Sequence, residues 1–269
     1  MDILLFILGS ITPYIAFFTL VLGLIYRVAR WLSIPVPFRF PVAPAPITYG
    51  GVLKRLSLDF FVFRNLIRGG KKLWLGGYVF HIALAITLVS HIINIYFHQV
   101  WEVIGYGWYE AVLYSGFFFL AVLSFLLIRR ILLPNIRYIS NVADYFILSL
   151  LIAVVFLGVF IRSFGLVDMA SVSRYMYSLL TFNPITPPNN VWFLTHYALA
   201  QMLFIYIPFS KVSHLIGWVL STTRNMRNIT RWKRHVNPWD YPVEVITWEE
   251  YYEKFREELE SIGPGGERR

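Results

Sequence analysis

Four histidines lie inside the apolar stretches of this sequence, and their spacing could place them on two metal centres. His81 and His91 stand ten residues apart in LWLGGYVFHIALAITLVSHIINIYF, and His196 and His214 stand eighteen apart in VWFLTHYALAQMLFIYIPFSKVSHLIGWVL. An imidazole costs free energy inside a bilayer, so four of them on two such runs need a common purpose. Two imidazoles can bind the iron of one b-type haem from opposite sides. The sequence therefore predicts two haems b, each held by two histidines.

The depth of each histidine in the membrane predicts how the four are paired. If the two runs are helices that cross in opposite directions, His81 lies level with His214, and His91 lies level with His196. At about 1.5 Å per residue, the separations along the helices are about 15 Å and about 27 Å, which would place two irons roughly 21 Å apart. On an unbroken fifth helix His196 and His214 would share one face. Such haems transfer single electrons, because two axial imidazoles leave no open position on the iron.

The residues alone leave other interpretations of these histidines open. They could be hydrogen-bonded core residues or a proton relay, although their matched depths favour ligation. A zinc site is less favoured, because the ligands lie at two depths and no acidic residue lies within the two runs. Gly76 and Gly77, one turn before His81, either admit a macrocycle or only aid helix packing. His98 falls at the membrane surface and His235 in the tail, where neither is expected to bind haem.

The elements that carry the histidines are predicted to be membrane helices. The 269 residues are 57% hydrophobic and 14% charged, which is not the composition of a soluble domain of this length. The absence of cysteine excludes iron–sulfur clusters and covalently attached haem in this chain. The fold class is therefore an all-α polytopic bundle of five transmembrane helices. The five runs are Ile3–Val28, Leu73–Phe97, Ala111–Ile128, Ala143–Phe164 and Val191–Leu220.

The basic residues predict the orientation of the bundle. Nine Lys and Arg lie from Arg27 to Lys72, three follow the third run and ten lie from Lys211 onward, whereas only Arg162 and Arg174 lie on the other side. By the positive-inside rule, the N-terminus is outside and the C-terminal tail is cytoplasmic. Membrane topology and anionic lipid also account for the net charge of +9, so no nucleic acid is expected as a partner.

Residues 47–70, on the predicted cytoplasmic side, carry further structure. They contain GVLKRLSLDFFVFRNLIRGG, which predicts one basic amphipathic helix on the membrane surface that ends at Gly69 and Gly70. We expect this helix to belong to a membrane domain of residues 1–222.

Residues 223–269 are predicted to form a cytoplasmic tail that docks a partner. Thr247 and Glu250 have the spacing of a capping box, which marks the start of a helix. Apolar residues then recur at helical intervals, at Trp248, Tyr252, Phe255, Leu259 and Ile262. A solvated tail helix is an equally good interpretation of this pattern.

The two histidine runs resemble a known family. FHIALAITLVSHI in the second run, and THYALA to IPFSKVSHL in the fifth, are similar to the cytochrome b (gamma) subunit of respiratory nitrate reductase. This family includes the cytochrome b subunits of membrane-bound heterodisulfide reductase and of sulfite-reductase-associated electron-transfer complexes. The resemblance covers roughly Leu73 to Leu220 and implies five helices, two haems b and menaquinol or ubiquinol chemistry. It implies that His81 and His214 hold the cytoplasm-proximal haem, and that His91 and His196 hold the distal haem.

The tail sequence RHVNPWDYPVEVITWEEYYEKFREELE resembles the sulfite-reductase-associated subunit more than the nitrate reductase subunit. The partner there is an iron–sulfur protein similar to the catalytic subunit of heterodisulfide reductase. The resemblance thus implies a cell-membrane subunit that passes electrons between menaquinone and a cytoplasmic iron–sulfur subunit, with further membrane or outer-face subunits in the complex. A cytochrome b subunit of a heterodisulfide reductase or a nitrate reductase is the alternative.

Contacts with quinone and with haem propionates are predicted near the outer pair. A quinone needs an apolar slot with a polar group at its carbonyl, and His91 lies at a suitable depth. The loop HQVWEVIGYGWYE could wall this slot, although an interfacial aromatic belt is the more common role of such residues. Arg162 ends a run at the level of the propionates, so we expect it to pair with one of them.

Two functions of other classes compete with electron transfer. A histidine-lined, proton-translocating transporter would be expected to have broken helices, internal repeats and acidic residues at mid-membrane, and the sequence predicts none of these. A structural anchor without a redox role would leave four depth-matched histidines unexplained.

Overall fold

The computed structural model describes the helical parts of the chain and contains no strand among them. The described residues are 3–34, 45–97, 106–220, 225, 227 and 246–261. They fall into two units, Met1–Ile34 with Pro41–Asn228, and Pro35–Phe40 with Ile229–Arg269. Each unit is described by itself below.

Five helical segments of the larger unit are long and apolar enough to cross a membrane. This confirms the predicted all-α bundle of five transmembrane helices and makes the chain a multi-pass membrane protein. The segments are Ile7–Ser33, Lys71–Tyr96, Glu110–Leu132, Val142–Ser163 and Val191–Phe209. They comprise a π-helical turn η1 (Ile7–Ile11) with α2 (Thr12–Ser33), then α5 (Lys71–Tyr96), α7 (Tyr106–Leu132), α9 (Val142–Ser163) and α11 (Val191–Tyr206).

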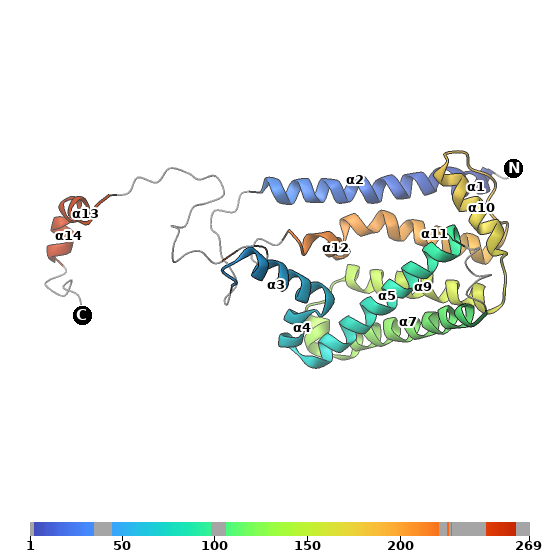
Figure 1. Ribbon diagram of the computed structural model, residues 1–269, viewed down its shortest axis with the longest axis horizontal. Helices are drawn as coiled ribbons and strands as arrows, with labels where there is room; N and C mark the ends of the chain where they lie inside the picture. The colour runs from blue at the N-terminus through green and yellow to red at the C-terminus, as the bar shows by residue number, and fades with distance from the viewer. Residues whose placement is uncertain are drawn as a thin grey trace. The chain divides into compact units, whose positions relative to one another are not determined.

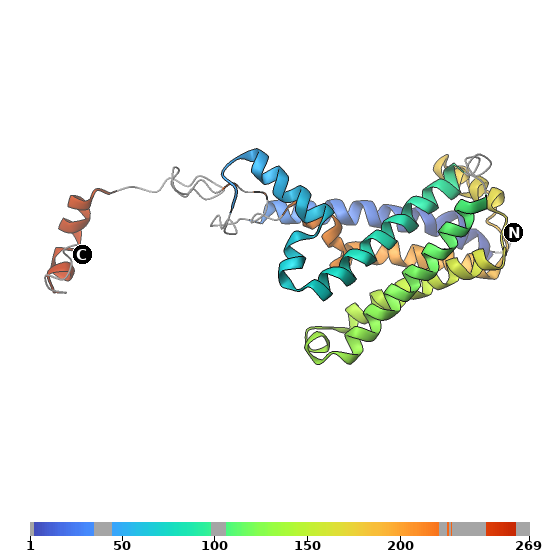
Figure 2. The ribbon, with the colours of Figure 1, turned by 60° about the horizontal axis from the view of Figure 1, so that its bottom comes forward.

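The long helices pack in an order that differs from their order in the sequence. Helix α2 packs on α11, α11 on α9, α9 on α7, and α7 on α5 (Figure 1). The helix α10 (Met169–Leu180) packs on α5 at one end of this bundle, near α1 (Ile3–Phe6). The helices α3 (Tyr49–Phe61) and α4 (Arg64–Gly69) lie at the other end (Figure 2). We call these the α10 end and the α4 end.

The core between α5, α7 and α9 is small, because most apolar side chains of a membrane bundle face outward. Its buried members are Ala83, Phe119, Leu123, Val155 and Val159. Gly116 lets α7 and α9 approach, since a Cβ there would lie 2.7 Å from Cγ2 of Val159. Small residues at such contacts are typical of helix packing in membranes.

A second buried cluster joins α10 to the start of the chain. Tyr175 is completely buried, and its phenol donates a hydrogen bond of 2.6 Å to the carbonyl of Gly9 in η1. Burial raises the pKa of Tyr175 to about 12, because the phenolate would be desolvated there. Asp168 caps α10 by accepting from two of its first backbone N–H groups. The sequence analysis did not predict α10.

The fifth membrane segment is broken into short pieces. In order, it consists of α11, two 3-10 turns, η2 (Ile207–Phe209) and η3 (Lys211–Ser213), and α12 (His214–Gly217). Pro208 explains the end of α11, because proline has no N–H to donate and its ring collides with the preceding turn. Ser210, between the two turns, has an extended backbone with φ −113° and ψ 176°.

This break corrects several expectations. The sequence predicted one helix from Val191 to Leu220, with His196 and His214 on a common face and about 27 Å apart along it. Because α11 ends at Tyr206, neither the common face nor that spacing applies, and the iron separation derived from it does not apply either. The expectation that the chain has no broken helix is wrong for the same reason.

Residues 47–70 form two helices and not the single helix that was predicted. Helix α3 ends at Phe61, and α4 begins at Arg64. Between them Phe63 adopts a left-handed backbone with φ 50°, which is unusual for a bulky residue. The predicted stop is confirmed, since α4 ends at Gly69 and Gly70 has φ 148°, a conformation that favours glycine.

The described part of the smaller unit is a pair of short helices, α13 (Trp248–Lys254) and α14 (Arg256–Ser261). The predicted capping box is confirmed, because Thr247 and Glu250 exchange side-chain to backbone hydrogen bonds of 3.2 and 2.7 Å. The single helix predicted here is interrupted at Phe255, where φ is −119° and ψ is 27°. Ile262 lies outside the described residues.

Candidate functional site

The structure brings the four histidines together as two pairs. His81 and His214 lie at the α4 end with ring centroids 6.1 Å apart, and His91 and His196 lie at the α10 end with centroids 6.3 Å apart. We call these the α4-end pair and the α10-end pair. The rings of the α4-end pair are nearly perpendicular, with an angle of 82°, whereas those of the α10-end pair are nearly parallel, with an angle of 16°.

Backbone carbonyls fix the tautomer of all four imidazoles. A carbonyl oxygen can only accept, so each Nδ1 that contacts one must carry the proton, and each Nε2 keeps a free lone pair. Metal-binding histidines are held in this way, with one ring nitrogen donating to the protein and the other facing the metal. The Nδ1 to carbonyl distances are 2.7 Å for His81 to Gly77, 2.8 Å for His91 to Thr87, 2.9 Å for His196 to Val154 and 2.9 Å for His214 to Lys211.

The spacing of each pair fits two imidazoles on one metal ion. A metal–imidazole bond is about 2 Å long, and the nitrogen lies about 1 Å from its ring centre, so centroids on opposite sides of one ion are about 6 Å apart. Among the residues that the structure describes, no three His, Asp or Glu side chains gather as a metal site. Two pairs without further protein ligands suit an iron whose other four ligands come from a porphyrin.

The α10-end pair is built on two continuous helices. His91 comes from α5 and is exposed, whereas His196 comes from α11 and is partly buried. Nδ1 of His196 donates to Val154 on the neighbouring helix α9, so three helices fix this pair. Gly158 leaves room for the His196 ring, since a Cβ there would lie 3.2 Å from its Cε1 atom.

The α4-end pair has a different support. His81 comes from α5, but His214 lies directly after the 3-10 turn η3 in the broken segment. Two phenylalanine rings meet His81 edge to face, Phe63 with centroids 4.9 Å apart and Phe80 with centroids 5.0 Å apart. The turn that carries Phe63 is tied to α5 by Trp74, whose indole N–H donates to the carbonyl of Val62 at 2.7 Å.

Polar side chains supply hydrogen-bond partners for backbone groups of the broken segment. Nε of Arg27 on α2 donates to the carbonyl of Pro208 at 2.7 Å. Ser210 caps the next turn, with its hydroxyl accepting from the N–H of Val212 at 3.1 Å. Gly23 allows α2 to approach, because a Cβ there would lie 2.6 Å from Pro208. Irregular backbone at membrane depth requires partners of this kind.

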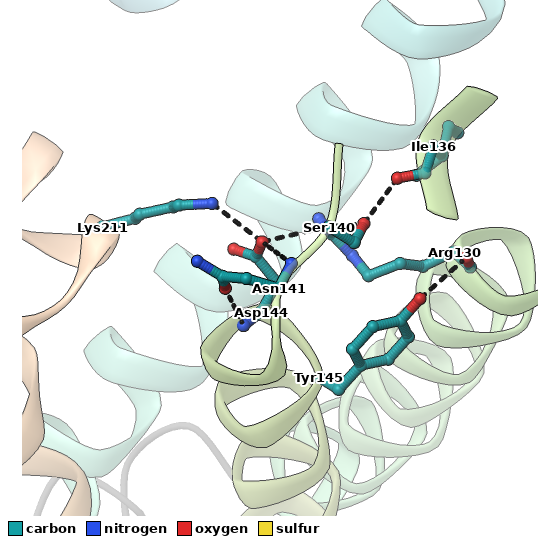
Figure 3. A network of polar contacts seen from close by, with 7 residues as sticks. All are labelled: Arg130, Ile136, Ser140, Asn141, Asp144, Tyr145 and Lys211. Atoms are coloured by element: carbon teal, nitrogen blue, oxygen red, sulfur yellow. Dashed lines mark hydrogen bonds and ion pairs between the residues drawn. The ribbon is translucent and has the colours of Figure 1, made fainter. Parts of the chain in front are cut away.

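An ion-pair network anchors the same segment to α9 (Figure 3). Oδ2 of Asp144, in the first turn of α9, lies 2.8 Å from Nζ of Lys211 and 3.5 Å from Nη1 of Arg130. Asp144 also completes a capping box with Asn141. Arg130 donates to the hydroxyl of Ser140 at 2.7 Å. Lys211 is the first residue of η3, the turn that directly precedes His214.

The remaining predicted site residues have varied positions. Arg162 lies in the last turn of α9, one turn beyond Gly158 and so near the level of the α10-end pair. Gly77 faces Leu66 of α4, since a Cβ there would lie 3.0 Å from Cδ2 of that leucine, which supports its packing role. His98, His235 and most of the loop HQVWEVIGYGWYE lie outside the described residues.

Several residues that hold the α4-end pair were not predicted from the sequence. Asn141 and Asp144 have the N-cap and N3 spacing of a capping box, so the start of α9 was detectable. Pro208 was a detectable helix-breaking signal. Nothing in the sequence indicated that Asp144 meets Lys211, or that Phe63 meets His81, because both contacts join distant parts of the chain.

Comparison with known proteins places the chain in a family. The model of the nitrate reductase gamma subunit family matches residues 65–233, which contain both histidine pairs. The chain is 30% identical to the Hdr-like menaquinol oxidoreductase cytochrome b-like subunit of Archaeoglobus fulgidus, over 95% of each chain. It is 31% identical to the protein of the same name from Archaeoglobus profundus, over 93% of each chain. Since the family model covers more than half of the chain and these relatives align along nearly their whole lengths, the protein belongs to the nitrate reductase gamma subunit family.

Proposed function

We propose that this chain is a membrane di-haem cytochrome b subunit that passes electrons between menaquinone and a partner subunit. The observation that carries the proposal is the two imidazole pairs, whose ring centroids lie at the spacing of two ligands on one metal ion, with Nδ1 of every ring donating to a carbonyl. A haem with two axial imidazoles has no open coordination position and exchanges single electrons when bound. Two such centres at opposite ends of the bundle suit electron transfer across the membrane.

The chain's own residues would hold the two haems in different ways. His81 and His214 would be the axial ligands at the α4 end, and His91 and His196 those at the α10 end. Arg162, one turn from the His196 level, would pair with a propionate. The exposed faces of His91 and His214 support this assignment, since an imidazole at membrane depth is costly unless something covers it.

The names of the relatives support menaquinol as the quinone and a multi-subunit complex as the setting. We propose that the α4 end faces the cytoplasm, because 22 of the 24 Lys and Arg lie on the segments of that side. The partner there would be an iron–sulfur subunit similar to the heterodisulfide reductase catalytic subunit. Association with sulfite reductase is the finer proposal and rests on the tail sequence.

The broken fifth segment is the observation that favours a transporter, because transporters build ion sites at such breaks. Two contacts argue against that function here. Asp144 is matched by Lys211 and Arg130 at the end of a membrane segment and not at mid-membrane. Each histidine Nδ1 donates to a carbonyl, which leaves one lone pair per ring and no hydrogen-bonded relay between the rings.

An optical experiment tests the proposed function. Membranes containing the full chain should show the reduced-minus-oxidised spectrum of b-type haem, and the purified complex should contain two haems per copy of this chain. Addition of a soluble menaquinol analogue should reduce both. A purified, correctly inserted protein without haem would refute the proposal. Haem whose spectrum changes only when a proton gradient is applied across the membrane would favour the transporter.

The tail is proposed to dock the partner. Trp248 is 65% exposed and stacks on Tyr251, so α13 presents an aromatic face that its own short helix pair does not cover. Truncation after Ser221 should leave the haem content unchanged and abolish co-purification of the iron–sulfur subunit. As a control, Glu253→Gln should leave co-purification intact. If the truncated chain still retains the partner, the docking surface lies in residues 47–70.

A further inference from the structure

The carboxylate of Asp144 is an unusual group for a membrane helix. Asp144 is only 7% exposed, although it lies in the first turn of a segment that is otherwise strongly apolar. Burial of a charge is costly unless it is paired and hydrogen-bonded. Its oxygens meet the N–H of Asn141 at 3.0 Å, Lys211 at 2.8 Å and Arg130 at 3.5 Å. The capping box explains the first contact, but it does not require the two cations.

Lys211 connects this carboxylate, which its side chain meets in Figure 3, to His214 of the α4-end pair. Its ammonium binds Asp144 on α9, and its backbone carbonyl accepts from Nδ1 of His214 at 2.9 Å. The same residue therefore holds α9 with its side chain and orients the imidazole with its main chain. Its side chain is 68% exposed, so the contact to Asp144 is not forced by packing.

The other three histidines do not need such a tie. Nδ1 of His81 and of His91 donates to a carbonyl one turn earlier in the continuous helix α5, and Nδ1 of His196 donates to α9. Those carbonyls belong to continuous helices, in which the backbone hydrogen bonds before and after each residue fix the direction of its carbonyl. The carbonyl of Lys211 belongs to a three-residue 3-10 turn that follows the extended Ser210. Short turns of this type have weaker hydrogen-bond geometry than an α-helix.

We propose that Asp144 is a positioning residue for His214, which it orients through Lys211. The ion pair fixes the turn whose carbonyl sets the plane of the imidazole, and so it maintains the 82° angle between the rings of the α4-end pair. Arg130 and Asn141 hold Asp144 in turn. This inference rests on the proposed function, because its consequence is measured at the haem of that pair.

The test is a comparison of Asp144→Asn, Lys211→Gln and the double variant in the intact complex. The relative rotation of two axial imidazoles changes how they split the iron d orbitals, so loss of the tie should shift the electron paramagnetic resonance signal of one haem. Both single variants should shift that signal in the same direction and leave the signal of the other haem unchanged. The double variant should shift it no further than a single variant, because both act through one contact.

Matched variants separate positioning from other effects. Lys211→Arg keeps the charge and should restore the wild-type signal. Glu253→Gln removes an exposed carboxylate from α13 and should change neither haem. Asn141→Ala removes the side-chain half of the capping box and keeps the backbone N–H that donates to Asp144, so it should lower stability without the same spectral shift.

Several outcomes would overturn the inference. If the two single variants shift the midpoint potential in opposite directions with unchanged resonance signals, Asp144 acts only through its charge. Equal changes at both haems, no change at either, or additive shifts in the double variant would each contradict a positioning role. If the complex does not assemble with Asp144→Asn, the resonance spectrum of Lys211→Gln alone decides between these outcomes. A wild-type complex without haem would refute the proposed function itself, which is a separate result.

Discussion

The two histidine pairs have nearly the same spacing but are built in different ways. At the α10 end, both imidazoles project from continuous helices, and a third helix supplies the carbonyl for His196. At the α4 end, one imidazole projects from a broken segment that side chains tie to α2 and α9. One ligand geometry can therefore come either from helix packing alone or from a turn that polar contacts hold. Substitutions of charged or aromatic residues should therefore affect the α4-end pair more than the α10-end pair.

The largest expected effect comes from the ligands themselves. Replacement of His91 or His196 by Ala should remove the haem of the α10-end pair, and the same replacement of His81 or His214 should remove the other. Each pair holds its own iron, so the ratio of haem to protein should fall from two to one. Haem content and resonance spectra of the purified variants measure this.

These variants also test the pairing. The two substitutions within a pair should remove the same resonance signal, and substitutions in different pairs should remove different signals. Loss of both haems from every single variant that still inserts normally would contradict two independent sites.

The next largest effect should come from Phe63, which has no counterpart among the described residues of the α10 end. Its ring covers His81 from a left-handed backbone that costs a non-glycine residue about 1–2 kcal/mol. Phe63→Ala removes the ring and keeps the strain, whereas Phe63→Gly removes both. Both variants should expose His81 and shift the potential of the α4-end haem only. Redox titration measures the potential, and the glycine variant should be the more stable by about 1 kcal/mol.

A result with equal stability of the two Phe63 variants would mean that the turn relaxes when the ring is lost. A shift at the α10-end haem would show that the turn between α3 and α4 does not act locally.

The α10-end pair should respond to helix packing. Gly158→Ala would bring a methyl group within 3.2 Å of the His196 ring, and overpacking of this kind costs about 1–3 kcal/mol. We expect a shifted signal from the α10-end haem and none from the other. Gly76→Ala is the matched control, because the nearest atom to its Cβ would be 3.6 Å away on Leu126. Equal effects of the two variants would indicate helix propensity and not contact with His196.

The smallest effect concerns the cluster beneath α10. Tyr175→Phe removes the hydrogen bond to Gly9 and should lower the free energy of unfolding by about 1 kcal/mol. The pKa of Tyr175 is raised from 10.0 to about 12, so the wild-type protein should lose stability as the pH rises from 10 to 12, where only the unfolded phenol ionises. The variant should lack this part of the loss. Thermal unfolding in detergent at several pH values measures both effects, and an identical alkaline loss in the variant would contradict the assignment.

The apolar runs and the positions of the four histidines were enough to predict the class of the fold and the members of the two pairs. Runs of apolar residues long enough to cross a bilayer predict helices regardless of context, because unpaired backbone groups are too costly in lipid. Opposite crossing directions then place His81 near His214 and His91 near His196, as the structure has them. The capping box at Thr247 was also predictable, because it depends on residues three positions apart.

The contacts that hold His214 could not be predicted in this way. Hydropathy does not distinguish a continuous helix from one that Pro208 interrupts, since both remain apolar. The partners of the break are Arg27, Asp144 and Phe60, which packs on Trp218, and they come from three distant parts of the chain. Polar contacts between distant residues depend on the packing of whole helices, and no local pattern records them. For this reason the sequence identified the candidate ligands, whereas the folded chain revealed the groups that orient them.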